Sequence, residues 1–426
     1  MPRKPPSRSL WSKAALAVCA VAGLLAAACS GGGGSGPASA HASALARAAA
    51  DSWLTITPSS GTKAALPGQG ITVTAAKGKL GHVSAQSGGV PVAGSMNSAG
   101  TQWHSTWALS VSASYQVTAS ATAPGAKPLT KTSTFTTLSP KSTFQTQIFE
   151  GAGQTYGVGM PLMLKFSEPI ANKAAVEQSL QLTTSQPVVG SWYWDGDTEL
   201  NFRPRQYWPA HTTVSFTGHL DGVEAAPGLY GDHTLTQTFT IGDSLIVVAS
   251  TASHHMDLYR NGTLFHSWPI STGKPGDNTP NGTYVTIEKG NPVLMTGPGY
   301  KLEVPWSVRF TFSGDYLHDA FWSVGEQGFT NVSHGCINMA PADAEAYYKL
   351  AVPGDPVTVT GSPRAGVWDN GWTEWFKAWP DYLAGSALHE AVLAGPDGSQ
   401  FVSPSAVPAP TGTAPLAGPA DNNATA

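Results

Sequence analysis

One short segment of the chain combines residue types that could perform nucleophilic chemistry. Residues 333–338 read Ser-His-Gly-Cys-Ile-Asn, so that Cys336 is preceded by Gly335 and His334. A second histidine, His318, lies upstream of this segment. Transfer of an acyl group by cysteine needs a thiol nucleophile, a base that takes its proton, and N–H donors for the oxyanion. The segment therefore predicts a cysteine hydrolase or acyltransferase.

The chemistry of the thiol sets a requirement on its surroundings. A free cysteine has a pKa of about 8.5, so little thiolate exists at neutral pH. We expect an imidazolium or a donor-rich pocket to lower the pKa of Cys336, and His318 and His334 are the two histidines that could do so. Gly335 has no side chain, which permits close approach of a substrate backbone and an unusual φ angle.

The N-terminus predicts export. Four basic residues within positions 3–13 precede an apolar run at 14–28 that is too short to span a bilayer permanently. Residues 25–29, Leu-Ala-Ala-Ala-Cys, and the Ser/Gly-rich stretch after them resemble a bacterial lipoprotein signal, which implies lipidation of Cys29 and a membrane anchor. Lipoprotein signals usually place Leu three positions before the cysteine, whereas Ala26 stands there, so a simple secreted protein is the alternative.

Export makes the cysteine count informative. Of the three cysteines, Cys19 lies in the signal and Cys29 would carry lipid, which leaves Cys336 without a disulfide partner. An unpaired thiol outside the cytoplasm is either buried and inert or used in chemistry.

Composition favours a β-rich protein. Charged residues make up 12% of the chain, while Gly (47) and Pro (33) are plentiful, a balance typical of short strands and turns. The net charge of -4 supplies no basic field, so we expect no nucleic-acid partner. Alternating strand patterns between turns over 52–140 and 141–242 predict two immunoglobulin-like β-sandwiches. We interpret both as spacers; the alternative is polysaccharide binding through Trp103, Trp107, Trp192 and Trp194.

The next unit, 243–361, carries a resemblance to a known family. His318, fourteen intervening residues and then residues 333–338 match the pattern of YkuD-type L,D-transpeptidases at every fixed position. Residues 279–284, Thr-Pro-Asn-Gly-Thr-Tyr, resemble a substrate-side segment of that family, and 341–350 is expected to form a short helix. Asp319 stands where many relatives have Ser, a change that still allows a backbone carbonyl to orient His318.

The resemblance implies roles for individual residues. Cys336 would be the nucleophile and His318 the general base, with His334 supporting the thiolate and Ser333, Gly335 and Asn338 shaping the loop. Further implied site residues are Met295 and Tyr300 at the ends of a lid shorter than in many relatives, with Tyr300 near the oxyanion, and Trp322 and Ser323 on the acceptor side.

The implied reaction is peptidoglycan transpeptidation. The nucleophile would attack the diaminopimelate carbonyl of a tetrapeptide stem, expel D-Ala, and pass the acyl group to a second stem in a 3→3 cross-link. Carbapenems are the implied covalent inhibitors. Alternatives are L,D-carboxypeptidase activity, attachment of a protein to peptidoglycan, and a non-catalytic wall-binding scaffold. We expect no cofactor. We also expect no metal, because a structural zinc site needs four ligands, whereas Cys336, His318 and His334 supply three and no further pair lies nearby.

The predicted fold is mainly β: two immunoglobulin-like sandwiches, the catalytic domain, and a short helical Trp-rich extension. In that extension, Trp and Phe residues at 368–379 recur at helical spacing and predict one aromatic helical face, packed on a neighbouring domain or, alternatively, binding sugar. The predicted division is a signal peptide at 1–28, a tether at 29–51, sandwiches at 52–140 and 141–242, the catalytic domain at 243–361, the Trp-rich segment at 362–398 and a disordered tail at 399–426.

Overall fold

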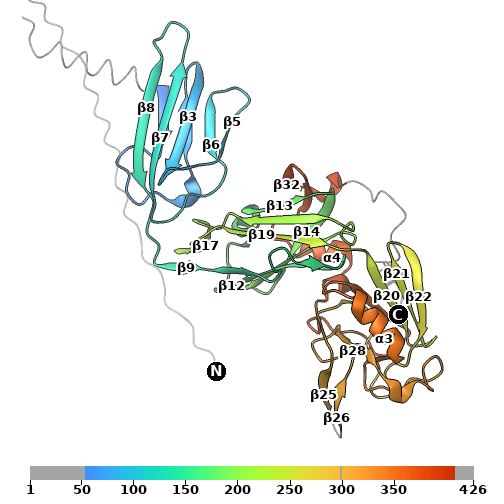
Figure 1. Ribbon diagram of the computed structural model, residues 1–426. Helices are drawn as coiled ribbons and strands as arrows, with labels where there is room; N and C mark the ends of the chain where they lie inside the picture. Colours follow the sequence, from blue (N-terminus) through green and yellow to red (C-terminus); the bar gives the residue numbers. More distant parts are fainter. Residues whose placement is uncertain (1–52, 298–299, 408–426) are drawn as a thin grey trace, which may run out of the picture. The chain divides into compact units, whose positions relative to one another are not determined.

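The computed structural model describes residues 53–297 and 300–407, and these residues form a mainly β protein (Figure 1). The predicted fold class is confirmed. The predicted signal and Cys29 lie outside the described residues. Within the described ranges, no helix is both long and apolar enough to cross a membrane.

The first sandwich consists of two four-stranded antiparallel sheets whose facing side chains are buried. Trp103 and Tyr115 belong to its core, with Trp103 only 7% exposed. One sheet has the order β1 (Leu54–Thr57), β2 (Thr72–Ala75), β6 (Gln102–Ser105) and β5 (Gly94–Met96), and the other has β4 (Val90–Pro91), β3 (Lys79–Ser87), β7 (Ser114–Thr122) and β8 (Leu129–Thr136).

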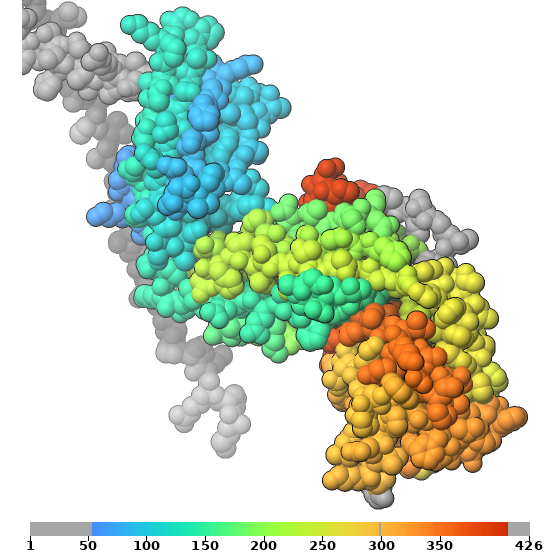
Figure 2. Space-filling view, in the orientation of Figure 1, coloured from blue at the N-terminus to red at the C-terminus, as the bar shows by residue number. Residues whose placement is uncertain are grey.

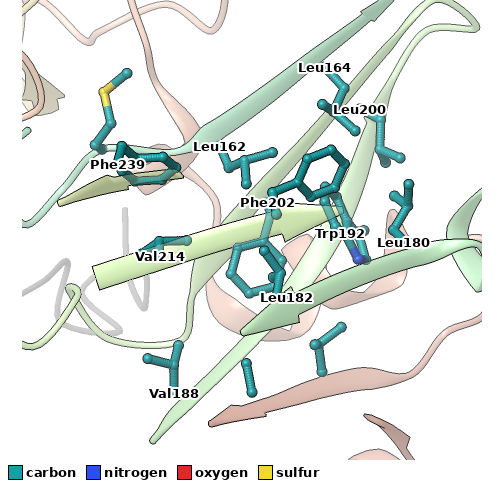
Figure 3. Packing of buried hydrophobic residues seen from close by; sticks show 14 of the residues in the cluster. Leu162, Leu164, Leu180, Leu182, Val188, Trp192, Leu200, Phe202, Val214 and Phe239 are labelled. Atoms are coloured by element: carbon teal, nitrogen blue, oxygen red, sulfur yellow. The ribbon is translucent and has the colours of Figure 1, made fainter. Parts of the chain in front are cut away.

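The second sandwich is built around a larger aromatic core (Figure 3). Trp192 and Phe202 pack with Leu162 of their own sheet and with Leu182 of the opposite sheet. Trp194 is also buried, and its indole nitrogen donates to Glu177 Oε1 at 2.7 Å. Burial of Trp103, Trp192 and Trp194 removes them from any sugar-binding surface.

The sheets of the second sandwich take strands from two distant parts of the chain. Strand β31 (Ala391–Gly395) pairs antiparallel with β14 (Val188–Asp195), and β32 (Gly398–Val402) pairs with β31. C-terminal residues therefore complete one of the two sheets. One sheet has the order β10 (Thr146–Ile148), β12 (Leu162–Phe166), β15 (Glu199–Pro204), β14 (Val188–Asp195), β31 (Ala391–Gly395) and β32 (Gly398–Val402). The other has β11 (Thr155–Tyr156), β19 (Leu235–Ile241), β16 (Thr213–Gly218) and β13 (Leu180–Thr184), with a small sheet of β17 (Glu224–Ala226), β18 (Leu229–Gly231) and β9 (Ser142–Phe144) and the helix α2 (Lys173–Gln178) beside them.

This pairing corrects the prediction that residues 399–426 form a disordered tail. Residues 399–402 lie in β32, because the backbone of β31 offers them a strand edge that the sequence alone does not reveal. Figure 2 shows the red C-terminal residues against the green strands of this sandwich. Residues 408–426 lie outside the described part of the chain.

The prediction of one aromatic helical face at 368–379 is wrong. Asp369 and Gly371 adopt positive φ angles of 71° and 132°, which a continuous right-handed helix excludes. Only a 3₁₀ turn (Glu374–Phe376) and the short helix α4 (Trp379–Ala384) form there. Trp375 is 1% exposed and donates from Nε1 to the carbonyl of Gly159 at 2.7 Å. The aromatic segment thus packs on the second sandwich, as its packing interpretation predicts.

The unit at 243–361 contains two sheets and a separate hairpin. Asn261 and Gly262, with φ angles of 49° and 81°, form the turn between β21 (His255–Arg260) and β22 (Thr263–Pro269). The expected helix is α3 (Pro341–Leu350). One sheet has the order β22 (Thr263–Pro269), β21 (His255–Arg260), β20 (Leu245–Ser250), β30 (Pro356–Thr360) and β23 (Gly282–Val285); the other has β24 (Glu288–Gly290), β27 (Ser307–Arg309), β28 (Tyr316–Asp319) and β29 (Ile337–Met339); β25 (Val293–Gly297) and β26 (Tyr300–Val304) form the hairpin.

Candidate active site

Two neighbouring strands position the predicted nucleophile and base. Strands β28 and β29 run parallel, and their register pairs His318 with Asn338. Cys336 immediately precedes β29, so the thiol stands close to the strand that carries His318. The pairing of these two strands therefore brings Cys336 and His318 together, although eighteen positions separate them in the sequence.

His318 is held as a neutral imidazole. Its side chain is 4% exposed, and its Nδ1 lies 2.7 Å from the backbone carbonyl oxygen of Asp319. A carbonyl can only accept, so Nδ1 carries the proton and Nε2 keeps a free lone pair. Burial lowers the pKa of His318 to about 4. His318 can thus accept a proton at neutral pH, and its orientation does not depend on the Asp319 side chain.

The environment of Cys336 differs from the prediction. Burial and the nearby carboxylate of Asp315 raise the pKa of the thiol to about 12, where a lowered value was expected. The sulfur lies 3.8 Å from the carbonyl oxygen of Gly314. Low polarity and a like charge both disfavour a thiolate. The raised pKa of the thiol and the lowered pKa of the imidazole both favour the neutral forms of Cys336 and His318.

Hydrogen bonds fix the loop that carries Cys336. The hydroxyl of Ser333 donates to the carbonyl oxygen of Cys336 at 2.6 Å and accepts from the Gly335 amide at 3.2 Å. Thr279 Oγ1 donates to the Gly335 carbonyl oxygen at 2.6 Å. Asn338 Nδ2 donates to Ser323 Oγ at 2.9 Å. Together these contacts hold the backbone on both sides of Cys336.

Gly335 occupies a position that no other residue could take without rearrangement. Its φ angle is 129°, and a Cβ built there would lie 2.3 Å from Asp315 Oδ1. The carboxylate of Asp315 also accepts from Thr311 Oγ1 at 2.8 Å, which ties it to its own turn. The glycine is therefore needed for space as well as for backbone conformation.

His334 lies in a different environment from His318. Lys274 Nζ donates to His334 Nε2 at 2.8 Å, and the His334 ring lies 5.5 Å from the Tyr300 ring, centroid to centroid. Its Nε2 lone pair is thus already engaged by a cation. Of the two histidines, only His318 presents a buried ring nitrogen without such a donor.

A cleft of about 360 Å³ brings the predicted site residues together. All of them line it except Gly335, which is buried, and Cys29, which is outside the described residues. The lining consists of Met295, Tyr300, Leu302, Val304, His318, Trp322, Ser323, Glu326, Val332, Ser333, His334, Cys336 and Asn338. In the described part of the chain, no group of three or more His, Cys, Asp or Glu residues is placed to hold a metal ion.

Sequence reasoning missed three polar residues at this site: Lys274, Asp315 and Glu326. Each comes from a different loop, and none belongs to the motif around Cys336. A weak signal existed for Asp315, which lies three residues before His318. For the other two, only the folded loops bring the side chains to the cleft or to His334.

Comparisons with known proteins agree with this geometry. The profile of the L,D-transpeptidase catalytic domain matches residues 244–359, and that of a bacterial Ig domain matches residues 62–224. L,D-transpeptidase 2 of Mycobacterium tuberculosis (strain CDC 1551 / Oshkosh) is 33% identical over 331 residues, which cover 74% of this chain and 80% of that protein. L,D-transpeptidase 5 of Mycobacterium tuberculosis (strain ATCC 25618 / H37Rv) is 33% identical over 352 residues, 79% of this chain and 77% of the relative.

A solved structure of L,D-transpeptidase 3 from Mycobacterium tuberculosis, in complex with a faropenem-derived adduct, is also similar. It is 30% identical, has a TM-score of 0.42, and covers 50% of this chain and 97% of that one. The extent of the sequence match to the two full-length relatives decides the assignment. The chain belongs to the L,D-transpeptidases, acyltransferases that act outside the cytoplasm on the peptidoglycan of the cell wall.

Proposed function

We propose that this enzyme forms 3→3 cross-links between the diaminopimelate residues of two stem peptides, with Cys336 as the acylated nucleophile. The observation that carries the proposal is the arrangement of His318. Its Nδ1 is committed to the Asp319 carbonyl while Nε2 stays free, inside a cleft that also contains the Cys336 thiol. A buried neutral base beside a thiol is suited to general-base catalysis of acyl transfer.

In the first half-reaction, the Cys336 sulfur attacks the diaminopimelate carbonyl of a tetrapeptide donor. A C–S bond forms, and His318 Nε2 takes the thiol proton. The C–N bond to the terminal D-Ala then breaks, and His318 returns the proton to the leaving amine. Backbone N–H groups at Cys336 and a neighbouring residue, with the Tyr300 hydroxyl at the lid, are the proposed donors to the oxyanion.

In the second half-reaction, an amine of the acceptor stem attacks the thioester. A new amide forms, the C–S bond breaks, and His318 passes the amine proton to the sulfur. Trp322 and Ser323 line the side of the cleft that we assign to the acceptor. Water in place of the amine would give L,D-carboxypeptidase activity, and an amine of a protein would give attachment to peptidoglycan.

A tetrapeptide stem tests the proposed reaction. We expect the purified protein to release D-Ala and to form a dimer whose tandem mass spectrum places the new bond between two diaminopimelate residues. Tripeptide with no dimer would indicate a carboxypeptidase. Neither product from a folded preparation would support the scaffold alternative and contradict the proposal.

β-Lactams are proposed covalent inhibitors on the same chemical grounds. The neutral Cys336/His318 pair can open any strained amide that fits beneath the hairpin carrying Met295 and Tyr300. Carbapenems are the expected class, because the proposed donor has an L-centre at the scissile bond. The product would be a thioester between the opened lactam and Cys336.

We also propose that Cys29 carries a lipid that anchors the enzyme to the membrane, with the two sandwiches as spacers between anchor and catalytic domain. The support is the run of small residues before Cys29 and the Ser/Gly-rich stretch after it. Cys29→Ala should move the protein from the membrane pellet to the soluble fraction. Continued pelleting of this variant would show that another segment anchors the protein.

A further inference from the structure

Glu326 is the only carboxylate among the described residues that line the active-site cleft. Its side chain is exposed and forms no ion pair with any residue in 53–297 or 300–407. The proposed reaction steps at Cys336 and His318 do not involve Glu326. Glu326 thus places an unpaired negative charge on the wall of a cleft in which the proposed acceptor is an amine.

The backbone of Glu326 is held in place by its own loop. Its amide donates to the Ser323 carbonyl oxygen at 3.1 Å, and its carbonyl oxygen accepts from Phe329 at 3.0 Å and from Thr330 at 2.8 Å. The next residue, Gln327, is buried and donates from Nε2 to the Ala320 carbonyl oxygen at 3.3 Å. The carboxylate therefore projects from a fixed base rather than from a freely moving loop.

The position of this loop relates Glu326 to the catalytic base. Glu326 follows Trp322 by four residues, and the Trp322 ring stacks near the His318 ring at 5.9 Å between centroids. The cationic residue at the site, Lys274, instead contacts His334, which in turn faces Tyr300. His334 therefore contacts the cation Lys274, whereas His318 lies beside the loop that carries the Glu326 carboxylate.

We propose that Glu326 binds the ammonium group of the acceptor stem and so determines which nucleophiles reach the acyl-enzyme. The inference deepens the proposed function and rests on it. The charge on Glu326 is opposite to that of an amine acceptor at neutral pH, and the residue shares a loop with Trp322 and Ser323, which line the acceptor side. Because Glu326 does not contact the thiol or His318, it is a specificity-determining residue rather than a catalytic one.

The proton balance of the step is simple. The acceptor enters as an ammonium ion held by the Glu326 carboxylate, and one proton leaves to solvent before attack. The neutral amine then forms the C–N bond as the C–S bond breaks. The second proton passes through His318 Nε2 to the Cys336 sulfur, which restores the thiol.

The test compares Glu326→Gln with Glu303→Gln, a matched control on the cleft hairpin. Leu302 and Val304 line the cleft, so Glu303 between them points to the opposite face of the strand. The donor is a tetrapeptide stem, and the acceptor is a tripeptide stem, which has no D-Ala to release. Cross-linked product is measured against acceptor concentration, and acylation is measured separately with a carbapenem.

We expect Glu326→Gln to raise the acceptor KM by about two- to fivefold, the range for one solvent-exposed charge pair. Carbapenem acylation should stay within about twofold of wild type in both variants, and Glu303→Gln should leave the acceptor KM unchanged. Glu326→Asp should recover part of the loss, and 0.5 M salt should shrink the difference between wild type and Glu326→Gln. With hydroxylamine, a nucleophile that is neutral at pH 8, the two proteins should react equally.

An unchanged acceptor KM in Glu326→Gln would overturn the inference. So would an equal loss in carbapenem acylation, because that result indicates a structural role for the loop. Absence of cross-linked product in wild type and both variants alike would instead refute the proposed transpeptidation, on which this inference depends.

Discussion

Cys336→Ala is expected to abolish D-Ala release and carbapenem adduct formation while leaving the protein folded. The substitution removes the proposed nucleophile but few packing contacts, because the side chain is only half-buried at the wall of the cleft. We expect a change in unfolding free energy of no more than about 1 kcal/mol. Circular dichroism of the variant and release of D-Ala from a tetrapeptide stem are the two measurements.

Cys336→Ser supplies the matched control for this prediction. It keeps the size and polarity of the side chain but replaces the thiol with a far weaker nucleophile, so its activity should also fall to background. D-Ala release near the wild-type rate in either variant would show that another residue is acylated.

His318→Ala should lower the rate of acylation by a factor of about 10²–10⁴, the usual contribution of a positioned acid–base group. His334→Ala should be less damaging, because His334 Nε2 is already engaged by Lys274. The measurement is the second-order rate constant for carbapenem acylation of each variant. A greater loss in His334→Ala would reverse the division of roles between the two histidines.

The pH dependence of wild type checks the same assignment. The base must be neutral to accept the thiol proton, and burial lowers the pKa of His318 to about 4. As pH falls, His318 is protonated only near that value, so acylation should be flat from about pH 8 to 6 and decline below about pH 5. Circular dichroism at each pH controls for unfolding. A midpoint near 6.5 would indicate a solvent-exposed histidine as the base.

The motif residues were predictable because their chemistry and spacing lie in one stretch of sequence. The pairing of β28 with β29 then brings His318 to Cys336, as the family resemblance implies. The raised pKa of the thiol was not predictable, since the low-polarity surroundings of the Cys336 sulfur and the approach of Asp315 exist only in the fold. Glu326 was missed for the same reason, as its loop carries no motif.

Alternating strand patterns predicted the two sandwiches. They did not predict that two C-terminal strands, β31 and β32, complete a sheet of the second one. Strand β32 forms because β31 presents a free edge after pairing with β14, a contact between residues about 200 positions apart in the sequence. The aromatic spacing at 368–379 fitted a helix, yet the backbone at Asp369 and Gly371 turns out of the helical region. The spacing of aromatic residues indicates which side chains are buried. It does not by itself determine the backbone conformation of the segment.

The identity of the acylated residue is the central claim, and intact-protein mass spectrometry after incubation with a carbapenem tests it most directly. We predict a gain of one inhibitor mass per chain, which peptide mapping should place on the peptide that contains residues 333–338, at Cys336. An adduct on a serine, or no adduct at saturating drug on a preparation that still releases D-Ala, would contradict the cysteine mechanism.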